Sequence, residues 1–320
     1  MLVDGTPVSE EAVTAWAARL ELLALERQAS FFEVTTAVAF ADFAARGVEI
    51  AVVEVGLGGR LDATNVVEPL ACGVTRIALE HTDYLGPTLQ GIAAEKAGIA
   101  KTGVPFFTTE TDPRIVAVLR AGSEERGARF EVVDPTLAAG RPLGLVGPYQ
   151  VANASLAVAL GRSLPTQLRP DQEAESSGLL WARLPGRFDR RGSWIFDVAH
   201  NPDGVRALVS ALRQADPPRP LTAVVAVLKD KAWREMLTLL APAVDRMVLT
   251  RAESAPAERA WDLHEAGDWC RVSGVRATAV PDLGAALREA REGAATVLVT
   301  GSFHTVGDAM QELPGFSPLD

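Results

Sequence analysis

Three glycines and one carboxylate lie close together in the stretch EVGLGGRLDATN, residues 54–65. Glu54 follows an apolar run, so we expect it at the carboxyl end of a strand, where open α/β sheets bind ligands. The glycines do not form a dinucleotide fingerprint, because that motif needs a small residue in place of Leu61. A P-loop is excluded too, because no Gly-Lys pair occurs in the 320 residues. Two partners for the Glu54 carboxylate stay open, a divalent cation and Arg60.

A histidine and a lysine stand in the stretch EHTDYLGPTLQGIAAEKAGIAK, residues 80–101. His81 ends an apolar run and is expected at the same sheet edge as Glu54. Lys96 lies in a helical segment with Ile92 and Ile99 as apolar neighbours. A lone lysine in such a helix is commonly a surface residue whose stem covers apolar neighbours. A lone histidine is commonly structural, so neither residue by itself indicates a reaction.

The elements that would carry these residues follow an alternating pattern. Short runs rich in valine and isoleucine alternate with segments of helical period, which is typical of a parallel sheet covered by helices. The predicted strands are Glu49–Val55, Gly73–Leu79, Val104–Thr108, Arg129–Val133, Trp194–Asp197, Thr222–Val227, Arg246–Leu249, Ala277–Val280 and Thr296–Thr300. The predicted helices are Ser9–Arg27, Phe31–Arg46, Thr88–Ala100, Pro113–Arg126 and Gln150–Gly161.

Two α/β units share the chain. A length of 320 residues with 48% hydrophobic residues favours two cores, because single cores stop growing at roughly 250 to 300 residues. The second alternating series begins near Ser193, after a segment rich in Pro, Gln, Ser and Glu at residues 162–183. We place the boundary near Pro185, which gives predicted domains of residues 1–185 and 186–320.

Charge and cysteine usage exclude several classes of protein. The net charge is −10, from 31 basic and 41 acidic residues, which opposes binding to nucleic acid and to an anionic membrane surface. No apolar run approaches the roughly 20 residues of a membrane span. Cys72 and Cys270 have no metal-ligand spacing, and two isolated cysteines fit a reducing compartment. We therefore expect a cytoplasmic protein without nucleic-acid or membrane partners.

The two stretches together resemble one family. EVGLGGRLDATN followed by HTDYLGPT and EKAGI is similar to the folylpolyglutamate synthase and dihydrofolate synthase family, relatives of the peptidoglycan Mur ligases. The similarity continues in order through GPYQVANASLAVAL at 147–160, LPGRF at 184–188, FDVAHNPDG at 196–204 and TGSFHTVG at 300–307. The fold implied by the resemblance is α/β, with a Mur-ligase-like, P-loop-type parallel-sheet domain, shortened at its N-terminus, followed by a smaller Rossmann-like domain.

The activity implied by the resemblance is ATP-dependent amide-bond formation. ATP phosphorylates the carboxylate of dihydropteroate or of a reduced folate, and the amine of L-glutamate attacks the acyl phosphate; on reduced folates this is polyglutamylation. The implied cofactors are ATP and Mg²⁺, with K⁺ as an open addition, and the implied assembly is a monomer. Two alternatives stay open: a Mur-type ligase acting on another carboxylate, and a non-catalytic nucleotide-binding remnant.

The catalytic residues implied by the resemblance are Glu54, His81 and Lys96. All three would bind magnesium, Lys96 as a side-chain carbamate. That modification replaces a cation by an anion with two oxygens, so the residue can serve a metal that an ammonium would repel. Metal ions are needed because the γ-phosphoryl group and the substrate carboxylate are both anionic.

The same motifs imply residues that bind the nucleotide and the pterin. The implied ATP-binding residues are Asn153, Arg187, Asp197, Val198, Ala199 and His200. Arg187 offers a bidentate fork to phosphate; its alternative is a salt bridge to Asp189 or Asp197, and the alternative for Asn153 is a helix cap. The implied pterin-binding residues are Ser30, Phe31, Phe32, Glu33, Leu61, Asp62 and Ala63. A phenylalanine ring can stack on a flat heterocycle; the alternative for these two rings is a place in the core.

The sequence also departs from the family pattern. The family's P-loop and a following serine motif lie upstream of the part that matches, so the implied phosphate cradle has no counterpart in residues 1–320. Three explanations are open: the sequence is recorded from an internal start, the missing part is supplied by another molecule, or the protein is a non-catalytic remnant. We favour the first explanation, and we expect this chain by itself to be inactive. A strand absent by comparison would belong beside the Glu54 strand, so unpaired backbone and exposed apolar surface are expected there. Smaller departures are Glu80, Tyr149 and the pair Phe303-His304.

Overall fold

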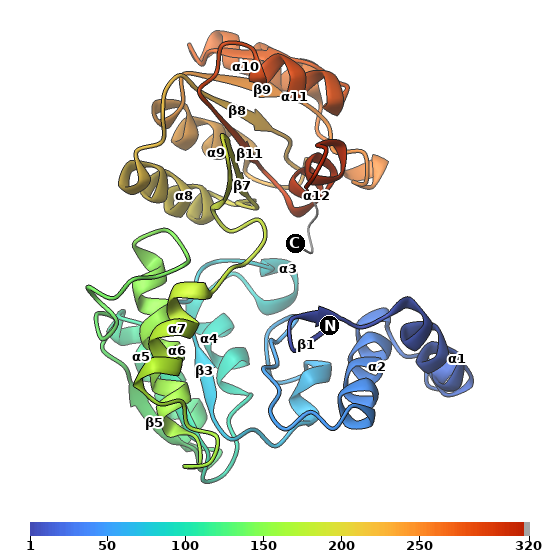
Figure 1. Cartoon of the computed structure of the whole chain (residues 1–320), viewed down its shortest axis with the longest axis vertical. Coiled ribbons are helices and arrows are strands. Elements are labelled where there is room, and N and C mark those ends of the chain that lie inside the picture. The colour runs from blue at the N-terminus through green and yellow to red at the C-terminus, as the bar shows by residue number, and fades with distance from the viewer. Residues whose placement is uncertain (317–320) are drawn as a thin grey trace. The chain divides into compact units, whose positions relative to one another are not determined.

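The computed structural model describes residues 1–316 and divides into two compact units (Figure 1). The first unit contains residues 1–135 and 156–169, and the second contains residues 136–155 together with the chain from residue 170 onward. Helix α6 (Tyr149–Ser163) therefore contributes its first half to the second unit and its second half to the first. The boundary near Pro185 expected from the sequence stays a prediction.

The first unit is built on a small parallel sheet with the strand order β3 (Cys72–Val74), β4 (Pro105–Thr108) and β5 (Arg129–Val132). Before this sheet, β1 (Leu2–Val3) and β2 (Thr6–Pro7) form an antiparallel pair. The helices are α1 (Glu10–Arg27), α2 (Phe31–Ala45), α3 (Thr82–Leu85), α4 (Leu89–Ala97) and α5 (Pro113–Glu124), with a 3₁₀ turn η1 (Ala63–Val66).

Both faces of the three-stranded sheet are covered. Phe106 of β4 belongs to a buried cluster with Ile92 of α4 and Leu119 of α5. Its neighbour Phe107 belongs to a different cluster, which includes Leu156 of α6. Consecutive strand residues point to opposite faces, so α4 and α5 cover one face and the second half of α6 covers the other.

One predicted strand of this unit is wrong and one is too long. The predicted strand Glu49–Val55 is not formed, and Val52 is 98% exposed. The predicted strand Gly73–Leu79 is regular only at its start, because β3 ends at Val74. A strand needs a neighbour that receives its hydrogen bonds, and within residues 1–316 no strand pairs with residues 49–55. The expected exposed apolar surface is present there, at Ile50 and Val52.

The second unit is built on six strands in the order β10 (Ala277–Ala279), β9 (Arg246–Leu249), β8 (Leu221–Val225), β11 (Thr296–Thr300), β7 (Trp194–Asp197) and β6 (Asp189–Arg191). All neighbours are parallel except β6 and β7. The helices are α7 (Gln172–Trp181), α8 (Pro202–Ala215), α9 (Trp233–Leu240), α10 (Leu263–Val272), α11 (Leu283–Arg291) and α12 (Phe303–Glu312), with 3₁₀ turns η2 (Ala241–Ala243) and η3 (Ala257–Arg259). The predicted strands of this unit agree with the structure to within two residues, whereas helix α7 was not expected from its polar sequence.

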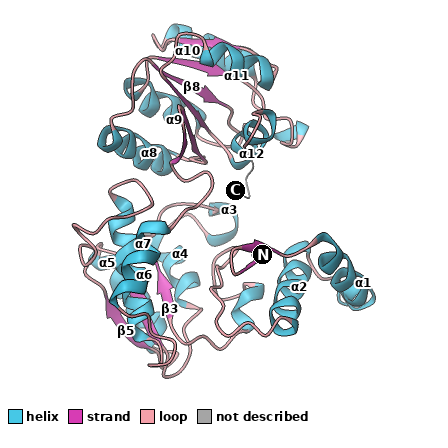
Figure 2. Ribbon diagram, viewed as in Figure 1, coloured by secondary structure: helices cyan, strands magenta, loops and turns pink. Residues whose placement is uncertain are grey.

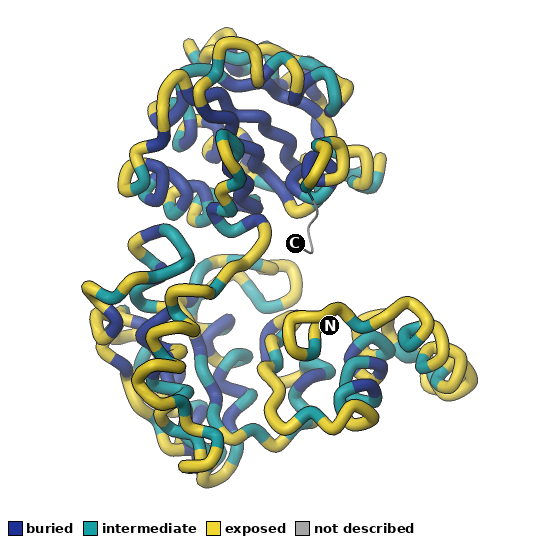
Figure 3. The backbone as a smooth tube through the Cα atoms, in the orientation of Figure 1, coloured by how far each residue is buried: buried dark blue, intermediate teal, exposed yellow. Residues whose placement is uncertain are grey.

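Helices cover both faces of the six-stranded sheet (Figure 2). Leu298 of β11 lies in the buried cluster with α8, α9 and α10, whereas Val297 and Val299 lie in the cluster with α11 and α12. Strands β8 and β11 consist only of buried residues (Figure 3). This explains why their sequences are mostly apolar, with threonine as the polar residue type, and do not alternate with exposed charged residues.

The strand order creates a candidate binding edge in the second unit. β11 lies between β8 and β7, so the chain reverses its direction across the sheet there. Open α/β sheets bind ligands outside the carboxyl ends of the strands at such a reversal. Thr300 and Asp197 are register partners at these ends, so the segments that follow β11 and β7 begin side by side. In the described part of the chain, no helix is both long and apolar enough to cross a membrane.

Candidate active site

A carboxylate closes the loop that follows Glu54. Asp62 accepts hydrogen bonds from the backbone N–H groups of Gly56 (3.1 Å) and Leu57 (2.9 Å). It also accepts from the N–H and the hydroxyl of Thr64. Partial burial works against ionisation of Asp62, but these donors outweigh it and hold the pKa of the carboxyl below its usual value. The loop is therefore folded around its own carboxylate, with Glu54 exposed at its start.

The same loop lies against the C-terminal turn of α4. The Arg60 N–H donates to the carbonyl oxygen of Glu95 at 2.9 Å, and the two side chains form an ion pair at 2.9 Å. Two glycines permit this approach. A Cβ at Gly59 would lie 2.8 Å from the Glu95 carbonyl oxygen, and a Cβ at Gly98 would lie 2.3 Å from the Arg60 Cβ. Arg60 is thus paired with Glu95, and the alternative in which it pairs with Glu54 is wrong.

Lys96 lies in this turn of α4, and a Cβ at Gly59 would be 3.1 Å from its Cα. The lysine is half-buried, and within residues 1–316 no hydrogen bond or ion pair engages its ammonium. His81 begins α3 with a φ of 52°. Leu85 at the end of α3 contacts Gly58, where a Cβ would be 3.0 Å away. The loop, helix α3 and the last turn of α4 therefore lie together.

The predicted magnesium ligands fit a divalent cation by the chemistry of their donors. The Glu54 carboxylate is exposed, and His81 Nε2 lies 3.8 Å from a carboxylate oxygen of Glu80. A carbamate on Lys96 would add two oxygens, which are the donors that Mg²⁺ prefers. No three His, Cys, Asp or Glu side chains gather as a metal site within residues 1–316. The predicted set contains only two residues of these types, so its third donor depends on the modified lysine.

The residues predicted to bind the pterin lie on α2 and on the glycine loop. Ser30 and Glu33 form a capping box, in which each side chain accepts a hydrogen bond from the other residue's N–H. The Phe32 ring lies on Gly56, where a Cβ would be 2.5 Å from the ring, whereas Phe31 is 86% exposed. Neither ring belongs to the buried core. The remaining predicted members are Asp62, used by its own loop, Leu61, which is exposed, and Ala63, which begins η1.

In the second unit, a buried carboxylate ends β7. Asp197 is 4% exposed and accepts hydrogen bonds from the N–H groups of Phe188 and Ala199, both at 2.9 Å. Burial raises the pKa of Asp197 above its usual value, although these two donors and the nearby Arg187 oppose the rise. Asp197 therefore ties the LPGRF turn to the segment that follows β7.

An aromatic ring from α12 joins two of the predicted nucleotide residues. The Phe303 ring centroid lies 5.5 Å from that of His200 and 5.7 Å from the guanidinium carbon of Arg187. Within residues 1–316 the Arg187 guanidinium makes no salt bridge with Asp189 or Asp197, so that alternative is wrong; Asp189 pairs with Arg191 instead. Phe303 was not predicted as a nucleotide residue. The available signal was its position directly after the predicted strand Thr296–Thr300.

Helix α6 adds two polar side chains. Asn153 lies inside the helix and donates from Nδ2 to Gln150 Oε1 at 2.9 Å, so its helix-cap alternative is wrong. Burial raises the pKa of the Tyr149 phenol, and the negative charge of the Asp197 carboxylate adds to the rise. In the segment after β7, His200 Nδ1 donates to the Val198 carbonyl oxygen at 2.9 Å, which orients the ring.

The fold and this binding edge define a ligase of the Mur class: residues 186–303 match the family model for the Mur ligase, glutamate ligase domain. The dihydrofolate synthase/folylpolyglutamate synthase of Bacillus subtilis (strain 168) is 31% identical over 346 residues, covering 97% of this chain and 80% of that protein. The chain belongs to the dihydrofolate synthase/folylpolyglutamate synthase family, as its motifs predicted.

Solved structures of the family show the same fold. E. coli FolC in complex with DHPP and ADP is 32% identical, with a TM-score of 0.83 over 97% of this chain and 77% of that chain. A bifunctional folylpolyglutamate synthase/dihydrofolate synthase with Mn, AMPPNP and L-glutamate bound is 32% identical, with a TM-score of 0.80 over 96% of this chain and 77% of that chain. The predicted Mur-ligase-like α/β fold is confirmed.

Proposed function

We propose that the chain is an ATP-dependent ligase that joins L-glutamate to dihydropteroate, to a reduced folate, or to both, through an acyl phosphate. The observation that carries this proposal is the match at 31% identity over 97% of the chain to a dihydrofolate synthase/folylpolyglutamate synthase. Related structures contain DHPP and ADP in one case, and Mn, AMPPNP and L-glutamate in another. A Mur-type ligase on another carboxylate and a non-catalytic remnant are not favoured, because the matched relatives are named for folate synthesis.

The divalent metal would be held by Glu54, His81 and the carbamate of Lys96. When bound, it offsets the negative charge of the phosphoryl oxygens and the substrate carboxylate. The half-buried Lys96 amine has no competing carboxylate partner within residues 1–316, so it is available for reaction with CO₂. The carbamate forms with release of one proton. Asp62 and Arg60 then keep the loop of Glu54 against the turn of Lys96.

We assign the nucleotide to Asn153, Arg187 and the segment Asp197–His200. Arg187 can donate two parallel hydrogen bonds to a phosphate or a ribose oxygen, because its guanidinium forms no ion pair within the described residues. Phe303 offers a ring face beside it for the adenine. Asp197 accepts hydrogen bonds from Phe188, which follows Arg187, and from Ala199, which precedes His200. These two bonds hold the turn of Arg187 next to the segment of His200.

We assign the pterin to Phe31, Phe32 and the loop residues Leu61–Ala63. The exposed face of Phe31 can stack on a flat heterocycle, and Phe32 is fixed against Gly56. The capping box of Ser30 and Glu33 sets the direction in which α2 presents both rings.

Three expectations complete the proposal: K⁺ as an added cation, a monomeric assembly and a cytoplasmic location. The location is supported by Cys72 and Cys270, which are both buried and form no disulfide. A net charge of −10 argues against nucleic acid as a partner.

Phosphate release with ATP, Mg²⁺, L-glutamate and dihydropteroate or tetrahydrofolate tests the reaction. The 320 residues contain no G-x-x-x-x-G-K-[ST] motif, so we expect little turnover from this chain and clear turnover from a version extended upstream by a segment that carries the motif. Robust turnover of the 320-residue chain would show that the reaction does not need a G-x-x-x-x-G-K-[ST] loop to bind the phosphates, contrary to our expectation. An extended version that binds ATP but never forms the glutamyl amide would contradict the proposed function.

The carbamate is tested separately. Lys96→Ala in the extended version should abolish turnover, and short carboxylic acids should partly restore it by supplying the missing oxygens. A ¹³C carbamate signal should appear with labelled bicarbonate in the unsubstituted protein and be absent from the variant. Full activity of Lys96→Ala without added acid would remove Lys96 from the metal site.

A further inference from the structure

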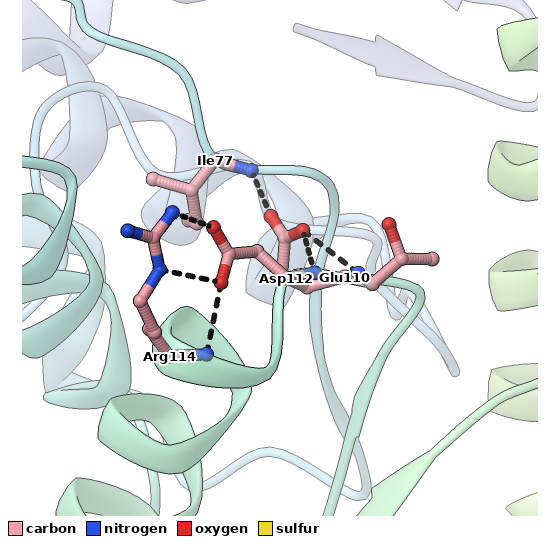
Figure 4. Close-up of polar contacts among 5 residues, drawn as sticks. Ile77, Glu110, Asp112 and Arg114 are labelled. Carbon is pink, nitrogen blue, oxygen red and sulfur yellow. Dashed lines mark hydrogen bonds and ion pairs between the residues drawn. The ribbon is translucent and has the colours of Figure 1, made fainter.

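Glu110 is a buried carboxylate whose hydrogen-bond donors are backbone N–H groups. It is 3% exposed and lies just beyond β4. One oxygen accepts hydrogen bonds from the N–H groups of Thr111 at 2.7 Å and Asp112 at 3.0 Å, and the other accepts from the Ile77 N–H at 2.9 Å (Figure 4). Within residues 1–316 no lysine, arginine or histidine pairs with it. Backbone donors therefore compensate the buried charge.

The bond to Ile77 joins parts of the chain that are 33 positions apart. Backbone pairing of β3 with β4 ends at Val74 and Thr108, and residues 75–80 have no regular secondary structure. A backbone N–H in this position needs another acceptor. The Glu110 side chain supplies it and so extends the connection between the two chain segments beyond the end of the ladder.

Ile77 is the anchor of the segment that ends at His81. Its side chain is 6% exposed and packs in the core formed with α4 and α5, while its N–H is held by Glu110. His81 follows a few residues later, in the left-handed backbone conformation that begins α3. A segment without ladder hydrogen bonds depends on such an anchor for the direction in which it leaves the sheet.

We propose that Glu110 is a positioning residue for the metal-binding edge of the first unit. It fixes the start of segment 77–81 and thereby the place of the His81 imidazole. This inference rests on the proposed function, because it takes His81 as a metal ligand. Groups that orient a metal ligand change metal affinity without touching the metal, and Glu110 does so through the backbone.

Glu110→Asp is the sharpest test. The shorter side chain keeps the negative charge and can still reach Thr111 and Asp112, but it falls short of Ile77 by one C–C bond, about 1.5 Å. Hydrogen exchange of the Ile77 amide and of residues 78–85 reports the anchor. Electron paramagnetic resonance of added Mn²⁺ reports metal affinity, without any need for turnover.

Two variants serve as references. Asp112→Asn alters a carboxylate in the same turn that pairs with Arg114, whereas the Ile77 N–H donates to Glu110 (Figure 4). His81→Ala removes the ligand itself. Should Glu110→Asp fail to fold, Glu110→Gln, which keeps the length but loses one acceptor oxygen, is judged by the same measurements.

In Glu110→Asp we expect the hydrogen-exchange rate of the Ile77 amide to rise about ten-fold, which is the effect expected from the loss of one hydrogen bond. We expect the Mn²⁺ dissociation constant to rise about ten-fold as well. Asp112→Asn should leave both unchanged. Unchanged exchange, or faster exchange with unchanged Mn²⁺ affinity, overturns the inference. If His81→Ala also leaves Mn²⁺ affinity unchanged, the metal assignment of the proposed function fails together with the inference; loss of affinity in His81→Ala alone refutes the inference only.

Discussion

The backbone N–H of Arg60 donates to the carbonyl oxygen of Glu95 at 2.9 Å, and the side chains of the same two residues form an ion pair at 2.9 Å. This double contact joins the loop after Glu54 to the turn of α4 that contains Lys96. The loop has little regular structure of its own, so its position depends on this contact and on the hydrogen bonds to Asp62.

Arg60→Ala should loosen this loop with a small cost in stability. The two side chains are 46% and 28% exposed, so the ion pair contributes about 0.5–1 kcal/mol at most. We expect hydrogen exchange to rise at Gly56 and Leu57, while the fold is kept. Arg271→Ala breaks a more exposed ion pair, with Asp268 in the other unit, and should leave exchange in the loop unchanged. Equal exchange in both variants would mean that the backbone bond to Glu95 and the hydrogen bonds to Asp62 hold the loop without the ion pair.

Gly98→Ala should be clearly destabilising although its backbone has ordinary helical angles. The added Cβ would lie 2.3 Å from the Cβ and 2.6 Å from the Cα of Arg60, so the loop or the helix end must move. Such overpacking costs about 1–3 kcal/mol. Gly178→Ala on α7 meets no atom within 4 Å and should instead stabilise by roughly 0.5–1 kcal/mol. Urea unfolding measures both, and an unaffected Gly98→Ala variant would show that the loop does not press on α4.

Asp197→Asn should change how stability depends on pH. Burial raises the pKa of Asp197 in the folded state above its unfolded value of 3.8. The folded state therefore binds this proton more tightly, and the resulting stability is fully present below pH 3.8 and is lost as pH rises through the folded pKa. The melting temperature of the unsubstituted protein relative to Asp197→Asn should thus fall as pH increases over that window. A difference that stays constant with pH would contradict the raised pKa.

Phe303→Ala should weaken nucleotide binding. Its ring contacts both Arg187 and His200, so the change removes a stacking face and loosens the arginine. Stacking of a base on an aromatic side chain contributes about 1–3 kcal/mol, which corresponds to at least a five-fold loss of affinity. Calorimetric titration with AMPPNP measures it. Trp181→Ala removes another exposed aromatic ring, 71% exposed on α7, and should have no effect; similar losses in both variants would argue against a specific adenine contact.

Much of the fold followed from local patterns. The central strands β8 and β11 are mostly apolar and buried along their whole length, so composition alone predicts them as strands. The predicted strand Glu49–Val55 also has an apolar, valine-rich centre but no pairing neighbour within residues 1–316. Apolar composition records a propensity, whereas strand formation also needs a partner for the backbone.

The sequence by itself determined the family, because motifs such as EVGLGGRLDATN and TGSFHTVG are recognisable from the order of their residues alone. Only the tertiary structure decided which partners those residues take. Arg60 forms its ion pair with Glu95 and not with Glu54. Phe303 lies beside Arg187 and His200. Glu110 accepts the hydrogen bond from the Ile77 N–H. These contacts join positions far apart in the chain, and the packing of whole elements brings them together, so no local pattern records them.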